Sequence, residues 1–386
     1  MFSDINKLLY SLIRRFYIRR LIKKGYSGYF APIVFDQRVD DLFRNKETTW
    51  KQKIWAQKRG FLSDKLSYYG LTEENYNDYL SDFDYWRLYP LNERFSHWID
   101  DKLTMKLILH PFSEHIPEYY YLMYDTKIVK LSDLPKGFEQ SINGVINLIK
   151  DKKALAMKLV YGSKGIGFYK IEFKNGDYLI NNEITDENSL NMLIESWKKH
   201  SVGYLITEYL FPHSDLKKIW PKTSNTLRLN VIRHNNQQPQ IIGSLIRFGT
   251  ETTGTVDNVA SGGIFSIVDL NNGHFNQGKI VVGRNLKDSP KHPNSGQPIE
   301  GYIPFWKDIK SKIIEICDYL SGLCYLGIDV IITQDTFKII EINSHPFIKN
   351  IQSNTPIYKN QFAAAFLRRK LLRNCQLAFE IIDEDY

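Results

Sequence analysis

A glycine-rich segment that follows a strand-like run has residue types suited to phosphate binding. The stretch 158–167 begins with Lys158, and its loop consists of small and basic residues: Gly162, Ser163, Lys164, Gly165 and Gly167. Glycines let backbone N–H groups approach phosphate oxygens closely, and lysines offset phosphate charge. Strand-like runs at 154–160 and 167–173 flank the loop, so the Walker A and Rossmann fingerprints do not fit, because both need a following helix. We expect a flexible hairpin that closes over phosphates, although such a hairpin by itself is equally consistent with an ordinary turn.

Oxygen ligands for a metal gather toward the C-terminal end of the chain. The runs 327–333 and 337–342 predict two strands joined by a short turn, with Asp329 on the first and Glu341 on the second. In such a hairpin Asp329 and Glu341 can lie side by side, and Asn343, two residues beyond Glu341, shares their face. Mg²⁺ prefers hard oxygen ligands and usually combines a few carboxylates with phosphates. The alternative is a pair of charges at a strand edge, which the apolar flanks disfavour because they indicate a buried sheet.

A third group of residues suits adenosine. A strand-like run at 204–209 leads into Glu208, Leu210 and then Asp215. Backbone groups and one carboxylate can read the edge of adenine, and a second carboxylate can accept hydrogen bonds from ribose hydroxyls. A strand end followed by ordinary surface acids is an equally good interpretation of this segment alone.

Together these segments resemble the ATP-grasp superfamily over residues 99–350, in the same order along the chain. Asp101-Lys102 is similar to the Asp-Lys start of the segment before the nucleotide site in D-alanine–D-alanine ligase and its relatives. The resemblance implies that Lys102 and Lys158 bind phosphates under the mobile loop 162–167, with ATP and Mg²⁺ as cofactors. It also implies that Glu208 and Leu210 bind adenine and that Asp215 binds ribose. The metal ligands that it implies are Asp329, Glu341 and Asn343.

The sequence departs from this superfamily at one position. The ligases usually carry an arginine two residues before the hairpin aspartate, but that position is Gly327. The arginine must therefore come from elsewhere, and Arg247 and Arg228, on predicted strands, are the candidates. We expect Arg247, or failing that Arg228, to stabilise the transferring phosphoryl group together with Lys158.

A narrower resemblance rests on the segments 221–228 and 256–263, which look like the sugar-transfer-associated ATP-grasp proteins of bacterial surface-polysaccharide (capsule) gene clusters. It implies a carbon–nitrogen ligase that phosphorylates a carboxylate, of a sugar acid, an amino acid or a glycan, and couples it to an amine. A small-molecule kinase is an alternative, for which His345 or His213 would suit a phosphohistidine relay. A non-catalytic polysaccharide-assembly partner is another, which the intact set of lysines, glycines and carboxylates disfavours.

Composition and charge indicate the partners and the cellular location of the protein. The net charge is +8, of which residues 1–24, with seven basic residues against one acid, carry +6. The rest is nearly neutral, so we expect no nucleic-acid partner. Three cysteines without a C-x-x-C pair, and no stretch of about 20 apolar residues, favour a cytoplasmic protein. Residues 5–24 predict a basic amphipathic helix, which either packs Leu8, Leu12 and Phe16 on the body or lies on the anionic inner membrane as a peripheral anchor.

The elements that must position these residues predict an α+β protein, as in the ATP-grasp fold of two α+β subdomains that clamp ATP. Further strand-like runs lie at 226–233, 240–247 and 263–269, and a helix is expected at 305–321. The expected organisation is a mainly helical region at 1–98, a preceding segment at 99–150, a lid subdomain at 151–212, a central subdomain at 213–355, and a C-terminal helix or tail at 356–386.

Overall fold

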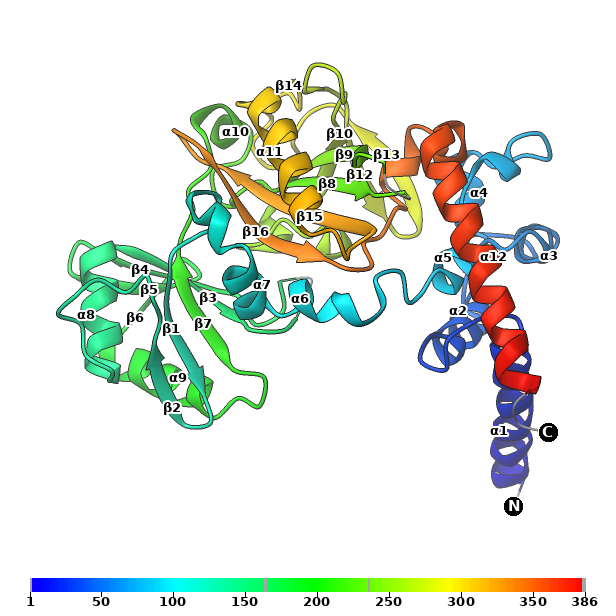
Figure 1. Ribbon diagram of the computed structural model, residues 1–386, viewed down its shortest axis with the longest axis horizontal. Coiled ribbons are helices and arrows are strands. Elements are labelled where there is room, and N and C mark those ends of the chain that lie inside the picture. The colour runs from blue at the N-terminus through cyan, green and yellow to red at the C-terminus, as the bar shows by residue number, and fades with distance from the viewer. Residues whose placement is uncertain (1, 163–164, 235–236, 384–386) are drawn as a thin grey trace.

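The computed structural model describes residues 2–162, 165–234 and 237–383, so Ser163 and Lys164 of the predicted phosphate loop lie outside the described residues. Figure 1 shows three parts along the long axis of the molecule: one sheet at the left, a second sheet in the middle and a group of helices at the right. Both described ends of the chain lie at the helical end. This mixture of helices and sheets confirms the expected α+β class.

The N-terminal part is helical. Its helices are α1 (Phe2–Ile22), α2 (Phe30–Phe43), α3 (Trp50–Lys58), α4 (Lys65–Tyr69) and α5 (Asp82–Arg87). Side-chain caps fix where two of them begin: Thr49 and Gln52 form a capping box at α3, and the Ser81 hydroxyl accepts the Asp84 N–H at α5. Two short helices, α6 (His97–Asp100) and α7 (Lys102–Ile108), then connect this helical region, residues 2–98, to the sheets.

The sheet at the left of Figure 1 is antiparallel and is here called the lid sheet, with the order β2-β1-β7-β3-β4-β5-β6. Its strands are β1 (Tyr119–Tyr124), β2 (Lys127–Lys130), β3 (Ala154–Leu159), β4 (Tyr169–Lys174), β5 (Asp177–Ile180), β6 (Glu183–Thr185) and β7 (Tyr204–Glu208). Helices α8 (Ile142–Lys152) and α9 (Glu187–Lys198) pack their apolar stripes on it. The boundary expected at residue 150 thus runs through one core, which β1, β2 and α8 share with the later strands.

The middle sheet, here called the central sheet, has the order β13-β12-β10-β9-β8-β15-β16. Its strands are β8 (Leu227–Ile232), β9 (Gln240–Phe248), β10 (Ile264–Ile267), β12 (Gly278–Val282), β13 (Asn285–Ser289), β15 (Tyr325–Ile332) and β16 (Phe337–Asn343), and β11 (His274–Phe275) pairs with β14 (Gly301–Tyr302) beside it. Helix α11 (Trp306–Tyr319) covers one face, whereas α12 (Gln361–Asp383) and the helical region cover the other. All eight residues of β15 are therefore buried.

The predicted strand runs correspond to β3, β4, β7, β8, β9, β10, β15 and β16, and the expected helix at 305–321 is α11. Strands β5, β6, β12 and β13 were not predicted. They are short and have few buried residues, so they lack the apolar run or clean alternation that marks a strand in sequence. Among the described residues, none of the helices has an apolar stretch long enough to cross a membrane.

Candidate nucleotide and metal site

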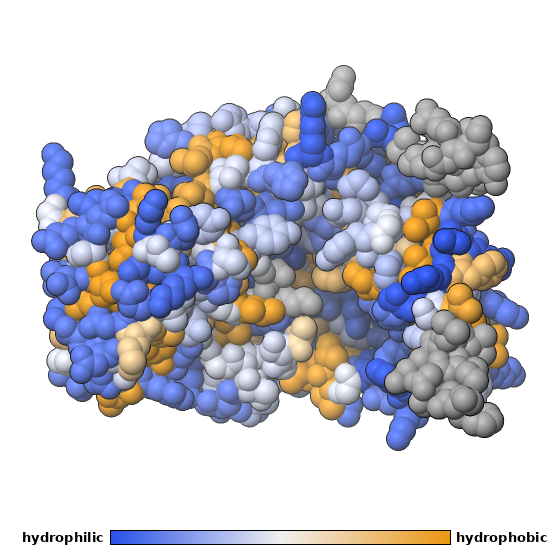
Figure 2. Space-filling view, turned by 90° about the horizontal axis from the view of Figure 1, so that it is seen from below, coloured by the Kyte–Doolittle hydropathy of each residue, from blue (hydrophilic) through white to orange (hydrophobic). Residues whose placement is uncertain are grey.

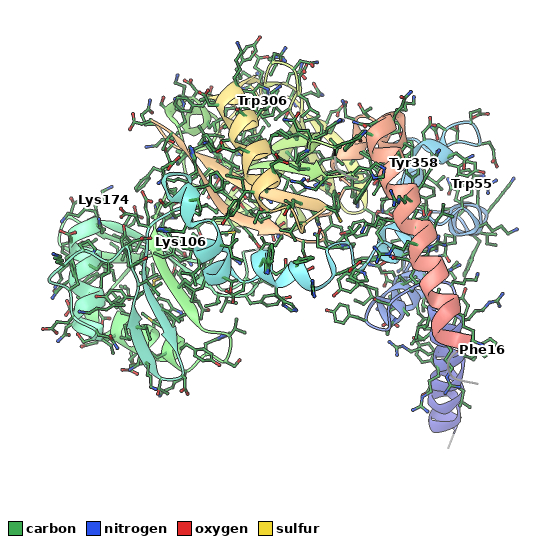
Figure 3. All side chains as sticks on the ribbon, viewed as in Figure 1. Phe16, Trp55, Lys106, Lys174, Trp306 and Tyr358 are labelled. Atoms are coloured by element: carbon green, nitrogen blue, oxygen red, sulfur yellow. The ribbon has the colours of Figure 1, made fainter. Side chains whose placement is uncertain are left out.

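A cavity of about 770 Å³ opens where the lid sheet, the central sheet and the helical region meet. Figure 3 shows Lys106 of α7 at the junction of the two sheets, where its ammonium lies 2.7 Å from an Asp133 oxygen. Most of the predicted site residues line this cavity: Lys102, Lys158, Gly162, Gly165, Glu208, Leu210, Arg228, Arg247, Asp329, Glu341 and Asn343. The structure thus brings together residues that lie up to 241 positions apart in the sequence.

Lys102 is buried at the start of α7. Asp101 caps the helix by accepting a backbone N–H, and the Lys102 N–H donates to the Val160 carbonyl (3.0 Å), which ties α7 to the end of β3. The Lys102 Nζ donates to the Gly162 carbonyl (2.8 Å) and lies 3.6 Å from Glu341 Oε1. One ammonium therefore touches both the glycine-rich loop and the metal hairpin β15–β16.

Lys158 points into the same junction from β3. Burial, and after it the nearby charge of Lys102, lower the pKa of its ammonium to about 7 against the opposing effect of Glu341. The Lys158 Nζ lies 5.0 Å from the centre of the Tyr119 ring, and within the described residues no hydrogen bond or ion pair holds it. The Lys158 side chain therefore has no hydrogen-bonded or ion-paired anion among the described residues.

Gly165 of the glycine-rich loop lies close to Val256, in the connection between β9 and β10. Gly165 has φ +73°, a conformation that favours glycine, and a Cβ there would lie 2.8 Å from a Val256 methyl carbon. Gly167 has φ +70° but does not line the cavity; a Cβ on it would meet the Tyr204 hydroxyl at 2.9 Å. Glycine at 165 therefore permits the close approach of the loop to the cavity, and glycine at 167 permits its turn into β4.

Asp329 lies between two arginines. The Arg228 guanidinium binds both of its oxygens in a fork, Nε to Oδ1 at 2.5 Å and Nη2 to Oδ2 at 2.7 Å, and Arg247 Nη2 lies 3.2 Å from Oδ1. Burial acts to raise the pKa of the Asp329 carboxyl, but the two guanidinium groups outweigh it and hold that pKa below its usual value. The strand β8 pairs with β15 so that Arg228 stands opposite Asp329. Both arginines expected to replace the one missing at Gly327 thus lie beside Asp329, and which of them has that role stays a prediction.

Glu341 and Asn343 complete the oxygen ligands of the hairpin. The register pairs Glu341 with Asp329, as expected, and Asn343 with Gly327, and a β-bulge between Asp329 and Val330 sets this pairing. The Asn343 Nδ2 donates to the Gly327 carbonyl (3.4 Å), which leaves its Oδ1 available. Among the described residues, no three His, Cys, Asp or Glu side chains converge as a self-sufficient metal site. This donor set therefore fits a Mg²⁺ ion held jointly with phosphates, mainly through Glu341 and Asn343, because Arg228 already occupies both oxygens of Asp329.

The lining of the cavity also includes four apolar residues, Ala156, Leu210, Ile331 and Ile340, here called the apolar slot, together with Glu208 at the end of β7. Apolar walls with a carboxylate in the same lining suit an adenine ring. Asp215 does not line the cavity: it is exposed at the start of α10 (Ser214–Ile219), where its Oδ1 accepts from the Lys218 ammonium (2.8 Å). Its ribose contact remains a prediction.

The two histidines considered for a relay lie in different places. His213 is outside the cavity lining, and its Nδ1 accepts the Asp215 N–H (3.2 Å) as the cap of α10. His345 lines the cavity two residues beyond Asn343, and burial lowers the pKa of its imidazole to about 4. At neutral pH that ring carries no charge.

Several residues of the cavity wall had no role predicted from the sequence. Asp257 accepts the Thr226 N–H (2.6 Å) and lies 3.6 Å from the Nε of Arg247, so it positions the second arginine. Tyr68 and Lys349 line the end of the cavity nearest the helical region. In the sequence, Asp257 was marked only as part of the segment 256–263 that carries the family resemblance. Nothing in the local sequence indicates that Tyr68 or Lys349 lines the cavity.

Comparisons with known proteins identify a family and several solved structures that are similar to this chain. A model of the family described as sugar-transfer associated ATP-grasp matches residues 84–358. Three solved structures align at low identity: D-alanyl-alanine synthetase A from Vibrio cholerae (14% identity, TM-score 0.43, 73% of this chain and 66% of that one), D-alanine–D-alanine ligase from Bacillus anthracis (13%, 0.36, 76% and 71%) and L-amino acid ligase from Bacillus licheniformis (8%, 0.39, 70% and 48%). This chain thus spans less than two thirds of the length of the first and third. No curated protein sequence matches it.

Proposed function

The chain belongs to the sugar-transfer-associated ATP-grasp family, and we propose that it is an ATP-dependent carbon–nitrogen ligase. The observation that carries this proposal is the convergence of two lysines, two arginines and the oxygen ligands of one hairpin on a single cavity with an apolar slot. In the proposed reaction ATP phosphorylates a carboxylate, and an amine then displaces the phosphate to give an amide, ADP and phosphate. Phosphoryl transfer needs positioning and charge neutralisation more than covalent help, and these residues supply both.

Each part of the cavity has a role in this proposal. The slot with Glu208 and Leu210 holds adenine, and Lys102 and Lys158 contact the phosphates under the glycine-rich loop. Arg247 is the guanidinium best placed to meet the transferring phosphoryl group, because Arg228 is already committed to both oxygens of Asp329. A Mg²⁺ ion held by the hairpin would offset phosphate charge in the loaded enzyme.

The substrates proposed are a sugar acid or an amino acid as the carboxylate and an amine, in the assembly or modification of a bacterial surface polysaccharide. The family description, which associates these proteins with sugar transfer, supports the polysaccharide setting.

The test is ATP turnover with pooled amines and pooled sugar and amino acids in the presence of Mg²⁺. We expect ADP and phosphate to appear only when both pools are present, together with an amide detected by mass spectrometry. AMP as the product would contradict this chemistry. A phosphorylated acceptor that accumulates without an amide would instead show a small-molecule kinase, and no turnover in any mixture would favour a non-catalytic role.

The lowered pKa of Lys158 predicts a pH dependence of nucleotide affinity. Below pH 7 the free protein already carries the ammonium, whereas above pH 7 the neutral amine must take up a proton when phosphates bind. The Kd for ATP should therefore rise by up to about tenfold per pH unit between pH 7 and 9. Calorimetry of ATP binding at several pH values, in buffers that differ in ionisation enthalpy, measures both the Kd and the proton uptake.

Lys158→Met serves as the control, because any titration of ATP itself persists in that variant. It should bind ATP more weakly at pH 6.5 and lose the proton uptake assigned to Lys158. Equal affinity and equal proton uptake in both proteins would show that Lys158 does not contact the nucleotide.

We also propose that α1 docks the enzyme on an anionic membrane surface. The helix packs on the body through Tyr17, Ile18 and Leu21, whereas Leu12 and Phe16 are 54% and 68% exposed. The account in which Leu12 and Phe16 are buried is therefore wrong; the side chain of Leu8 lies outside the described ones. Figure 3 shows Phe16 at the helical end of the molecule, and Figure 2 shows apolar and hydrophilic surface interleaved there.

Replacing the three exposed arginines of α1, Arg15, Arg19 and Arg20, by glutamine should weaken binding to anionic vesicles. Each basic residue near such a surface contributes about 1 kcal/mol, so the triple variant should lose roughly 100-fold in partitioning at low salt. Co-sedimentation with phosphatidylglycerol vesicles measures this, and added salt should weaken wild-type binding as well. The matched control removes three exposed lysines elsewhere, Lys199, Lys217 and Lys307. If wild type binds anionic and neutral vesicles equally, the helix is only structural.

A further inference from the structure

The cavity continues beyond the metal hairpin to an end built jointly with the helical region. The segment 345–350 follows β16, and Tyr68 of α4 lines the cavity opposite it. Three tyrosine hydroxyls fasten the segment to the helices: Tyr68 donates to Asn350 Oδ1 (2.6 Å), Tyr69 to the Lys349 carbonyl (3.3 Å) and Tyr85 to the His345 carbonyl (3.0 Å). The helical region, whose sequence carries no readable motif, therefore forms one wall of the cavity.

The imidazole of His345 lacks hydrogen-bond partners in this wall. Both of its ring nitrogens are buried, and neither has a partner among the described residues. The ring stands among aromatic side chains, with its centre 4.5 Å from Tyr85, 5.7 Å from Tyr89 and 5.9 Å from Phe30. Leaving a buried polar atom unpaired costs about 1–3 kcal/mol, and an aromatic cage offers little to offset it. Because the ring lines the cavity, a bound molecule is the natural partner.

Lys349 provides a cation at the same end. Its Nζ lies 4.1 Å from the centre of the Tyr68 ring and 3.4 Å from Asp64 Oδ2. That contact with Asp64 is weak, because Asp64 receives two shorter bonds from Lys65 at 2.8 and 2.9 Å. An ammonium has three protons to donate, so Lys349 retains donors for a ligand. Its neighbours in the lining include Phe347, whose side chain is 56% exposed.

We propose that this end of the cavity binds the amine substrate through a carboxylate of its own, with Lys349 as the cation and His345 as a hydrogen-bond partner. The proposal rests on the proposed ligase function and names the class of its amine: an amino acid or an amino-sugar acid. The carboxylate that becomes phosphorylated must lie near Arg247 and the metal hairpin, so the carboxylate bound at Lys349 is a second one. The lining of this one cavity of about 770 Å³ includes both Lys158 and Lys349, so the proposed amine end is continuous with the proposed nucleotide end.

The experiment measures ligand binding to the full chain by calorimetry with Mg²⁺ and ADP present. The probes are the standard amino acids with D-alanine, and muramic acid as an amino-sugar acid. Their uncharged counterparts are amino-acid amides and glucosamine. We expect at least one acid to bind at least tenfold more tightly than its uncharged counterpart. If that acid is an amino acid, the amine substrate is an amino acid, and if it is muramic acid, the amine substrate is an amino-sugar acid. If no acid binds, or if every acid binds no better than its counterpart, the proposal is overturned.

Substitutions of Lys349 and His345 test whether the acid binds at this end of the cavity. Lys349→Met should weaken binding of that acid at least tenfold and leave the Kd of ADP unchanged. Lys359→Met, which removes an exposed lysine ten residues away, should change neither the Kd of that acid nor the Kd of ADP. His345→Phe should weaken binding, and His345→Asn should recover part of it, because the amide restores a hydrogen-bonding group without the ring.

Two outcomes separate this inference from the ligase proposal. If amide synthesis proceeds and Lys349→Met binds the acid as well as wild type does, the site assignment is wrong and the ligase proposal stands. If wild type binds no nucleotide at all, the ligase proposal itself fails.

Discussion

Glu341→Gln is expected to abolish ATP turnover, with a loss of at least 10³-fold in kcat, about 4 kcal/mol in activation free energy. The substitution keeps the shape of the side chain but removes the hairpin carboxylate that is free of arginine, and with it the strongest oxygen ligand left for Mg²⁺. It also removes the negative partner 3.6 Å from the Lys102 ammonium. Release of ADP under saturating ATP, Mg²⁺ and substrates measures the effect.

The fold should survive this substitution, because Glu341 is partly exposed at the cavity wall and receives no hydrogen bond from the described residues. Circular dichroism and the thermal midpoint check this. Glu315→Gln is the matched control, since it makes the same change on an exposed face of α11, where Glu315 pairs only with Lys312. Wild-type kcat in Glu341→Gln would refute the metal assignment.

Arg247→Ala is expected to lose catalytic rate, whereas Arg228→Ala is expected to lose stability. Arg247 lies 3.2 Å from Asp329 and 3.6 Å from Asp257 and binds neither carboxylate in a fork, so its removal should leave the fold largely intact but lower kcat about 10²–10³-fold with little change in KM. Arg228 holds both oxygens of the buried Asp329, and its removal leaves that carboxylate underpaired. Breaking a buried pair in this way typically costs about 3–5 kcal/mol of stability.

Steady-state kinetics together with urea unfolding separates the two effects. Arg247→Lys keeps the charge but loses the planar fork, so it should recover only part of the rate. Arg233→Ala is a control for stability alone: it removes a guanidinium bonded to Asp318 outside the cavity, and it should lower stability without lowering kcat. If Arg247→Ala keeps full kcat, the charge on the transferring phosphoryl group is stabilised by another residue.

The sequence by itself determined the parts of the site that depend on local geometry. Asp329 and Glu341 lie on the two strands of one predicted hairpin, and Asn343 shares the face of Glu341 because strand side chains alternate with a period of two. The direct pairing of Asp329 with Glu341 also needs a β-bulge between Asp329 and Val330, because the register at the turn would otherwise pair Asp329 with Ile340. The glycines of the loop 162–167 and the strand-like runs beside it predicted the flanking strands β3 and β4, whereas the phosphate-binding role of the loop stays a prediction. Family and fold are confirmed by the match over residues 84–358. Apart from the β-bulge, each of these features could be inferred from residues close together in the sequence or from the order of the motifs along the chain.

Only the tertiary structure decided which distant groups meet. Arg228 faces Asp329 across 101 positions, because the register of β8 against β15 is set by the whole central sheet and not by either strand alone. That contact makes Asp329 an anchor for arginine as well as a candidate metal ligand. Lys349 meets Tyr68 in the same way, since the segment after β16 is fixed by hydroxyls of a helical region that folds against it. Side-chain pairs of this kind have no local periodicity, so the sequence shows the residues but not their partners.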